Sequence, residues 1–466
     1  MHSKFLESKK SLATELVSKL GKYFKYVSIL GTDVDNKMYR ADVRGKDISD
    51  SMSAERGFVV KVNNGRAFYE YSFDNFDDVD SIVKVMKDNY LSPDDKEINA
   101  LEVKEEKLVK SFEREGDFDK FSEEEILTKL DDYVKELKAK DEHVLNSFAY
   151  LNKLEVNKLF VSKEKCLDQH YTWANVYVMV VYRDGDKVVE PREQAYSNKI
   201  GECFDKIPAL LDKVIDKGRH LVKATQIKPG VYDIITDPSI TGLIAHEAFG
   251  HGVEMDQFVK ERALAKKYVG DYVASPITNM HDGASSGFST ASYFFDDDGV
   301  LAHDTLVIDK GILVKGICDL TSSRELGVEP TGNGRRESYK RKAYTRMTNT
   351  FFEPGKDKLE DMIKSVKHGY FLFETNNGME DPKNWAIQCT AEYGIEIVDG
   401  KLTDNYVAPV VMSGYVPDLL KSISMISDEF ELEGSGSCGK GYKEWVRVSS
   451  GGPYLKAKVK LSWWID

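Results

Sequence analysis

The pattern of apolar residues changes part-way along the chain, and this change constrains the fold more than any other feature of the sequence. Before about residue 225, helical spacings such as Leu12, Leu16 and Leu20 alternate with strand-like runs. The runs 58–62 and 67–73 flank Asn-Asn-Gly (63–65), which is a hairpin signal. After Gly252, many short β-prone runs are separated by Gly, Asn and Asp. We therefore predict an α+β fold, with an N-terminal mixed α/β domain (1–225) and a β-rich C-terminal domain (226–466).

Further helices are expected at 79–89, 122–138 and 208–223. The second begins with Ser122 and places Glu125 three residues later, which is a capping box. The charged segment 94–120 predicts a solvated loop or an exposed helix. Strands are expected at 144–151, 158–162, 172–181 and 230–236, and the last of these ends at Asp237-Pro238.

The net charge restricts the classes of partner. A formal charge of −13 over 466 residues argues against nucleic-acid binding and against docking on an anionic membrane, since both require a basic surface. No run approaches the roughly 20 apolar residues that span a bilayer. The start of the chain lacks a signal-peptide core, and the five scattered cysteines do not suggest a disulfide framework. We expect a cytoplasmic protein.

The sequence after the strand at 230–236 contains His246, Glu247 and His251. In the zinc-peptidase motif His-Glu-x-x-His, two histidines four apart share a helix face, and the glutamate takes a proton from metal-bound water. Here the histidines are five apart, which leaves them roughly 140° apart around a regular helix. They converge only if the helix is distorted or ends between them, and Gly250 and Gly252 give that freedom. The alternative is a chance grouping of histidines.

Four stretches together resemble the TldD/PmbA family of peptidases, which carries His-Glu-x-x-x-His. They are His-Glu-Ala-Phe-Gly-His-Gly-Val-Glu-Met-Asp (246–256), Pro-Thr-Gly-Asn-Gly-Arg-Arg-Glu (330–337), Arg-Met-Thr-Asn-Thr (346–350) and Gly-Ser-Cys-Gly-Lys (436–440). The resemblance covers roughly residues 230 to 450 and implies the catalytic, TldD-like type. It implies His246, His251 and Cys438 as metal ligands and Glu247 as the catalytic glutamate. Imidazole and thiolate ligands suit one divalent zinc ion, with Fe²⁺ as the alternative.

The resemblance also implies a homodimer or a heterodimer with a related subunit, acting on short or unfolded peptides. Arg335 and Arg336 are candidates for holding a substrate carboxylate or a structural acid. Thr348 and Asn349 lie in an expected strand that could pair with an extended peptide. Two acids after the motif either orient His251 or cap the next element: Glu254 and Asp256.

The sequence thus predicts a metallopeptidase that hydrolyses peptides through a metal-activated water, with its metal-binding helix near the domain junction. Two alternatives remain. One is a peptide-binding protein with a structural metal, for which a closed four-ligand site would be evidence. The other is a metal-dependent hydrolase of a non-peptide amide, whose turnover would not depend on peptide length.

Overall fold

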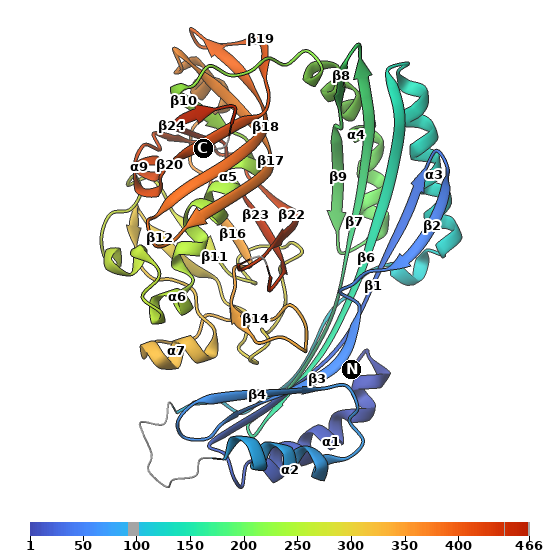
Figure 1. Cartoon of the computed structure of the whole chain (residues 1–466), viewed down its shortest axis with the longest axis vertical. Helices are drawn as coiled ribbons and strands as arrows, with labels where there is room; N and C mark the ends of the chain where they lie inside the picture. Colours follow the sequence, from blue (N-terminus) through green and yellow to red (C-terminus); the bar gives the residue numbers. More distant parts are fainter. Residues whose placement is uncertain (92–101, 442, 465–466) are drawn as a thin grey trace.

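A computed structural model describes residues 1–91, 102–441 and 443–464. Its N-terminal half is built on a nine-stranded sheet whose long strands β1, β6 and β7 run along the molecule (Figure 1). The order is β4-β3-β1-β6-β7-β5, with β2 paired to β1 and both β8 and β9 paired to β7. The strands are β1 (Tyr26–Asp42), β2 (Gly45–Asp50), β3 (Glu55–Asn63), β4 (Phe68–Phe73), β5 (Leu108–Arg114), β6 (Val144–Ser162), β7 (Lys165–Asp184), β8 (Lys187–Val189) and β9 (Arg192–Ser197).

Two pairs of helices cover this sheet near its two ends (Figure 1). They are α1 (Lys4–Leu20) with α2 (Val79–Tyr90), and α3 (Glu123–Lys140) with α4 (Ile200–Leu221); a short turn η1 (Phe118–Lys120) precedes α3. Each pair contributes to its own apolar cluster against the strands. The capping box is confirmed, because Ser122 and Glu125 exchange side chain-to-backbone hydrogen bonds at the start of α3.

The C-terminal half contains three further sheets. The first joins β10 (Gly230–Thr236), β17 (His368–Asp381), β18 (Ala386–Val398), β19 (Lys401–Val407), β20 (Val410–Tyr415), β21 (Met425–Ile426) and β24 (Leu455–Ser462). Pairing of β10 with β24 closes five of these strands into a ring. The second joins β11 (Met280–Asp282), β12 (Thr305–Asp309), β13 (Ile312–Leu313), β16 (Asn349–Phe352), β22 (Glu431–Cys438) and β23 (Val446–Gly452); the third pairs β14 (Gly334–Arg335) with β15 (Tyr344–Thr345).

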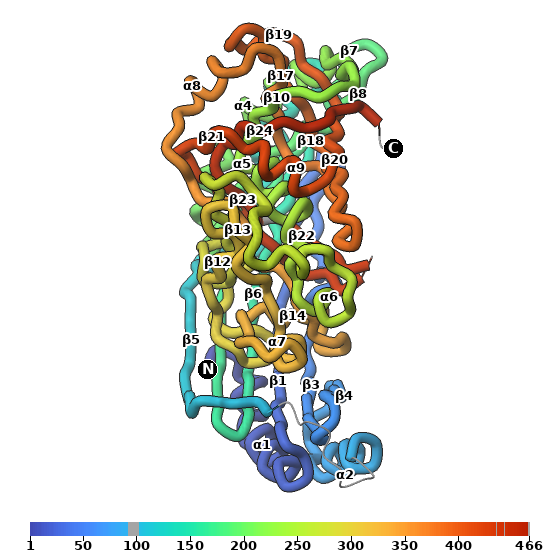
Figure 2. The backbone as a smooth tube through the Cα atoms, turned by 90° about the vertical axis from the view of Figure 1, so that its left-hand side faces the viewer, coloured from blue at the N-terminus to red at the C-terminus, as the bar shows by residue number. Residues whose placement is uncertain are grey.

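Short helices connect these sheets and pack around a large apolar core. They are α5 (Pro238–Leu243), η2 (Ile244–Gly250), η3 (His251–Val253), α6 (Met255–Val259), η4 (Leu264–Tyr268), α7 (Leu320–Leu326), α8 (Leu359–Lys364) and α9 (Val416–Lys421). In Figure 2 this β-rich half faces the viewer, and β1 and β3 emerge below it toward α1 and α2. Among the described residues, no helix is both long enough and apolar enough to cross a membrane.

The α+β fold class is confirmed, while three element boundaries differ from expectation. Helix α4 begins at Ile200 rather than near 208, so Pro208 lies inside it. Strand β6 continues through residues 152–157, where polar side chains alternate with buried ones and so conceal the strand in the sequence. Within the charged segment, residues 92–101 lie outside the described residues, but 108–114 form the edge strand β5 rather than a loop or helix.

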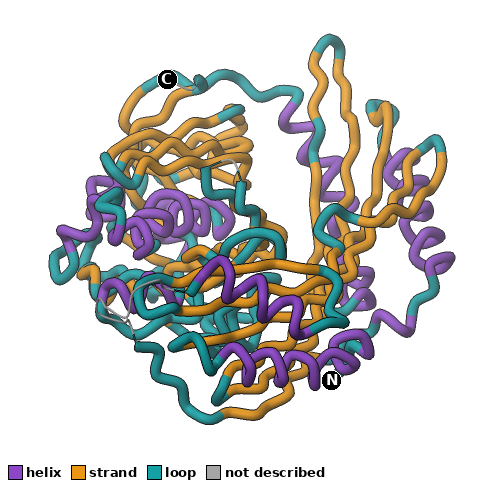
Figure 3. The backbone as a smooth tube through the Cα atoms, turned by 60° about the horizontal axis from the view of Figure 1, so that its bottom comes forward, coloured by secondary structure: helices purple, strands orange, loops and turns teal. Residues whose placement is uncertain are grey.

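The chain passes from one half to the other through residues 222–229, and Figure 3 shows the strands of the two halves standing opposite each other. A loop of the C-terminal half packs on the long sheet, where Phe295 joins the buried Phe160. Nearby, Lys61 Nζ lies 2.7 Å from Asp298 Oδ1, and both side chains are buried. Apolar packing and buried ion pairs therefore fix the position of the two halves relative to each other.

Candidate metal centre

Strand β10 leads directly into the helix that carries the histidines. Its last residue is followed by Asp237, whose carboxylate accepts a hydrogen bond from the Ile240 amide at 2.8 Å and caps α5. Pro238 occupies the first helical turn, where its missing N–H is not needed. Asp237 and Pro238 therefore define where the helix begins, and all residues of α5 are buried.

The helix becomes a π-helix over Ile244–Gly250, and this change brings the two histidines together. The backbone N–H of His251 donates to the carbonyl of His246, a bond between residues five apart. Residues five apart consequently lie one above the other, and the two imidazole rings meet edge to face with centroids 5.2 Å apart. The unusual spacing in the sequence is accommodated by this one wide turn.

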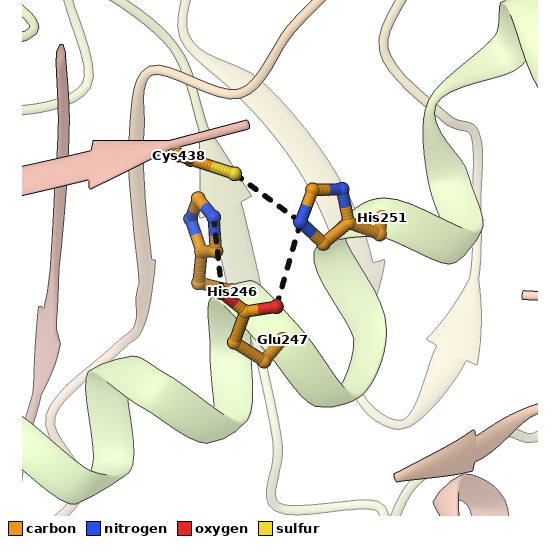
Figure 4. Close-up of side chains that lie close together, drawn as sticks. All are labelled: His246, Glu247, His251 and Cys438. Carbon is orange, nitrogen blue, oxygen red and sulfur yellow. Dashed lines mark hydrogen bonds and ion pairs between the residues drawn. The ribbon is translucent and has the colours of Figure 1, made fainter. Parts of the chain in front are cut away.

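Cys438, at the end of β22, joins them from a distant part of the chain (Figure 4). Its Sγ lies 3.3 Å from His251 Nε2, while the Glu247 carboxylate lies 3.8 Å from His246 Nε2 and 3.5 Å from His251 Nε2. One ligand atom from each of the four residues lies within 4.8 Å of the others. His246 is only 4% exposed, yet neither of its ring nitrogens has a hydrogen-bond partner. Buried, unpaired nitrogens beside a thiol are what a zinc ion would satisfy, so these residues fit a divalent metal.

The charges of the four groups favour an ionised thiol and an ionised carboxylate, and Cys438 in turn raises the pKa of both imidazoles against the effect of their burial. Burial would raise the pKa of the Cys438 thiol, but His246 and His251 outweigh it and lower this pKa to about 5. Burial would likewise raise the pKa of Glu247, but hydrogen bonding to His251 and the charges of both histidines hold it below its ordinary value. At neutral pH the site therefore presents a thiolate and a carboxylate.

His246 and Glu247 are among the residues that line a cavity of about 770 Å³. Its walls come from both halves of the molecule: β7, β9 and α4 on one side, and α5, β17 and β22 on the other. The cavity is large enough for several residues of an extended peptide, and it gives a substrate access to the Glu247 carboxylate.

The C-terminal half matches a protein family. Residues 229–460 match the model of the PmbA/TldA metallopeptidase C-terminal domain. The chain belongs to the TldD/PmbA family. It is 32% identical over 244 residues to a metalloprotease of Methanothermobacter thermautotrophicus, covering 52% of each chain. It is 29% identical over 317 residues to the zinc metalloprotease TldD homolog of Saccharolobus solfataricus, covering 67% of this chain and 70% of that one.

The alignment with the first of these relatives therefore spans about half of that protein's length. Solved structures share the whole fold at low identity. TldE from Thermococcus kodakarensis superposes with a TM-score of 0.75 at 19% identity, covering 96% of this chain and 99% of that one. A proposed modulator of DNA gyrase from Thermotoga maritima gives a TM-score of 0.80 at 17% identity, covering 98% and 100%.

In this TldD/PmbA protein a network of buried charged side chains contacts His251 and Cys438. Glu254 accepts from His251 Nδ1 at 3.3 Å and lies 3.0 Å from Lys440 Nζ. Arg346, which is fully buried, lies 3.4 Å from Glu254 and donates to the Cys438 sulfur at 3.1 Å. Glu254 therefore orients His251, as one of the two sequence alternatives held. The second acid of that pair, Asp256, contacts Lys440 instead.

The structure places the predicted substrate-binding arginines away from the histidines, in contacts within the protein. Arg335 donates to the backbone carbonyls of Met347 at 2.5 Å and Arg447 at 2.6 Å. Arg336 forms a two-pronged hydrogen bond with Glu70 of the N-terminal sheet, with both distances 3.1 Å. Both arginines line a separate cavity of about 140 Å³ between the two halves. Their contact with a substrate stays a prediction; in the structure Arg336 joins the two halves, whereas Arg335 bonds within the C-terminal half.

Thr348 and Asn349 are fully buried. The Thr348 hydroxyl donates to Asp282 at 2.8 Å, and the Asn349 amide donates to the Ser292 hydroxyl at 2.9 Å. Neither is among the described residues that line the cavity with His246. Their side chains hold β16 and the residue before it against β11 and against the loop that carries Ser292, and a backbone contact with a peptide stays a prediction.

Sequence reasoning missed two acidic residues of the cavity, Asp237 and Glu433. The sequence indicated Asp237 only as the residue that precedes a proline at the start of a helix, and not as a residue of a cavity. Glu431 and Glu433 are two apart on a strand and so share a face, which was the available signal. A bulge between Glu433 and Gly436 shifts the strand register. The residue spacing alone therefore does not show whether the two glutamates and Cys438 lie on the same face of β22.

Proposed function

We propose that this chain is a His-Glu-x-x-x-His metallopeptidase that hydrolyses short or unfolded peptides. His246, His251 and Cys438 would hold one zinc ion, with iron as the alternative, and Glu247 would be the catalytic base. The observation that carries the proposal is the convergence of these four groups, from a π-helix and a distant strand, beside a peptide-sized cavity that His246 and Glu247 line.

A bound zinc ion would supply a Lewis acid that polarises the scissile carbonyl and lowers the pKa of water. The Glu247 carboxylate would accept a proton from the attacking water and deliver it to the amide nitrogen as the C–N bond breaks. Its low pKa leaves it ionised and ready to accept that proton. Glu254 would keep the Nδ1 side of His251 fixed, so that Nε2 faces the site.

We further propose that the protein acts in the cytoplasm as a homodimer or as a heterodimer with a related subunit. The likeness in fold to TldE supports a related partner. A cavity closed by a second subunit would exclude folded proteins and admit extended peptides.

The test is metal content and hydrolysis of a set of unfolded peptides by purified protein, alongside Glu247→Gln and the control Glu124→Gln on the exposed face of α3. We expect one metal per chain in all three proteins. We expect hydrolysis to fall about 10²–10⁴-fold in Glu247→Gln only. Metal without hydrolysis in any of them would favour a peptide-binding protein with a structural metal. Hydrolysis that is independent of peptide length would favour a small-amide hydrolase. Absence of metal would refute the proposal.

A further inference from the structure

Two histidines and two glutamates of the N-terminal half lie together, outside both the metal centre and the 770 Å³ cavity. His170 of β7 is paired in the sheet with Glu113 of the edge strand β5. Glu155 lies on β6, two residues from the partner of His170 in that ladder. His2 precedes the N-cap residue of α1 and stacks on the His170 ring, with centroids 3.6 Å apart. Figure 2 shows the N-terminus beside β5, so the start of the chain and three strands meet at these side chains.

The contacts of Glu155 indicate which ring nitrogens carry a hydrogen. Nε2 of His170 lies 3.0 Å from Glu155 Oε1, and Nε2 of His2 lies 2.9 Å from the same oxygen. A carboxylate only accepts hydrogen bonds, so each Nε2 carries the hydrogen. In a neutral imidazole the other nitrogen, Nδ1, then holds a lone pair. Glu155 therefore holds both rings in the tautomer that leaves Nδ1 as an acceptor.

Both Nδ1 atoms face a third acceptor, the Glu113 carboxylate. Its Oε1 lies 3.4 Å from Nδ1 of His170 and 3.8 Å from Nδ1 of His2. His170 is only 6% exposed, yet its Nδ1 has no hydrogen-bond partner. Two lone-pair nitrogens and a carboxylate oxygen thus lie within 4.8 Å of one another, in a grouping that a shared cation would stabilise.

A single divalent ion satisfies this group better than protons do. One proton leaves one of the two Nδ1 lone pairs unpaired, and two protons place positive rings 3.6 Å apart, where they repel each other. Ligand atoms of a tetrahedral zinc ion lie about 3.3–3.5 Å apart, which is close to the 3.4 and 3.8 Å between Glu113 and the two rings. The rings are parallel to within 2°, so the His2 ring, which is 46% exposed, turns out of the stack when both lone pairs bind one ion.

We propose that His2, His170 and Glu113 form a second site for a divalent metal ion, and that zinc is the ion that fits it. Imidazole and carboxylate ligands both suit zinc. Glu155 holds Nε2 of His170, as carboxylates do behind zinc-bound histidines. The site has no thiolate and is partly exposed, so it binds zinc more weakly than the centre at His246 and fills after it. The bound ion ties the start of the chain to the edge strand β5 and to β7.

The first experiment counts the zinc ions that metal-free protein binds in a calorimetric titration. Wild type is compared with His2→Ala, an exposed position, and with the control His368→Ala. His368 matches His2 because it pairs with Glu396 at 3.0 Å and its side chain is 51% exposed. We expect wild type and the control to bind one more zinc per chain than His2→Ala. Because all three proteins keep the centre at His246, this difference does not depend on whether that centre binds. Equal counts in wild type and His2→Ala would overturn the proposal.

The second experiment identifies the ligands of the additional ion. Zinc-edge X-ray absorption is measured on wild type before and after the weaker site fills, and the two spectra are subtracted. We expect nitrogen and oxygen neighbours at about 2.0–2.2 Å and no sulfur around the added zinc. Glu113→Gln should lose the additional zinc, whereas Glu124→Gln on α3 should keep it, and Glu155→Gln should bind it about 10–100-fold more weakly. A sulfur neighbour at the added ion, or its retention by Glu113→Gln, would overturn the assignment.

Discussion

The buried arginine behind the metal centre gives the sharpest prediction about stability. Arg346 is fully buried, lies 3.4 Å from Glu254, and donates to the carbonyl and the sulfur of Cys438 at 3.0 and 3.1 Å. Arg346→Met removes these bonds and leaves a buried carboxylate with one cation fewer. Loss of one member of a buried ion pair costs about 3–5 kcal/mol. Because Lys440 remains 3.0 Å from Glu254, we expect the lower end, about 3 kcal/mol.

The assay is urea unfolding of metal-free protein in EDTA, followed by tryptophan fluorescence, so that the metal does not contribute. The matched control is Arg44→Met, because Arg44 pairs with Asp42 at 2.9 Å but its side chain is 82% exposed. An exposed pair contributes about 0–1 kcal/mol, so this control should remain close to wild type. If Arg346→Met also stays within about 1 kcal/mol of wild type, the buried network does not support the site as described.

Two further predictions concern the Cys438 thiol and the packing of the helix against β23. Metal-free protein should gain thiolate absorbance near 240 nm as the pH rises through about 5, because two histidines lower the pKa of Cys438. The substitution Cys438→Ser should abolish that step, and a first step above pH 8 in the wild type would contradict the prediction. Gly242→Ala should lower the free energy of unfolding in urea by about 1–3 kcal/mol, because the added Cβ would lie 2.4 Å from a backbone nitrogen of β23. Gly414→Ala should be neutral, because nothing lies within 4 Å of its added Cβ. Equal stability of the two variants would argue against this packing.

Much of the fold could be predicted because its local signals are strong. The Ser122–Glu125 capping box and the hairpin around Gly65, with φ of 91°, both depend on a few adjacent residues. The boundaries that failed depend on tertiary context. Pro208 reads as a helix start but lies within α4, and β5 is a strand only because it pairs with β7 at the edge of the sheet.

In the candidate site, too, local features could be predicted from the sequence, whereas contacts between distant segments could not. The spacing of His246 and His251 predicts that the helix must be distorted, and a π-helix supplies that distortion. Cys438 came only from the resemblance, since nothing near it in the sequence shows that β22 ends beside the histidines. The role of Arg346 could not be predicted, because it depends on side chains brought together from distant segments.

The measurement that tests the central claim most directly is zinc-edge X-ray absorption of the purified, zinc-loaded protein, alongside Cys438→Ser. The account predicts one sulfur neighbour at about 2.3 Å and two imidazole nitrogens at about 2.0–2.1 Å, with the sulfur shell missing from the variant. Zinc without a sulfur neighbour in the wild type, or no zinc bound at all, would contradict the metal centre formed by His246, His251 and Cys438.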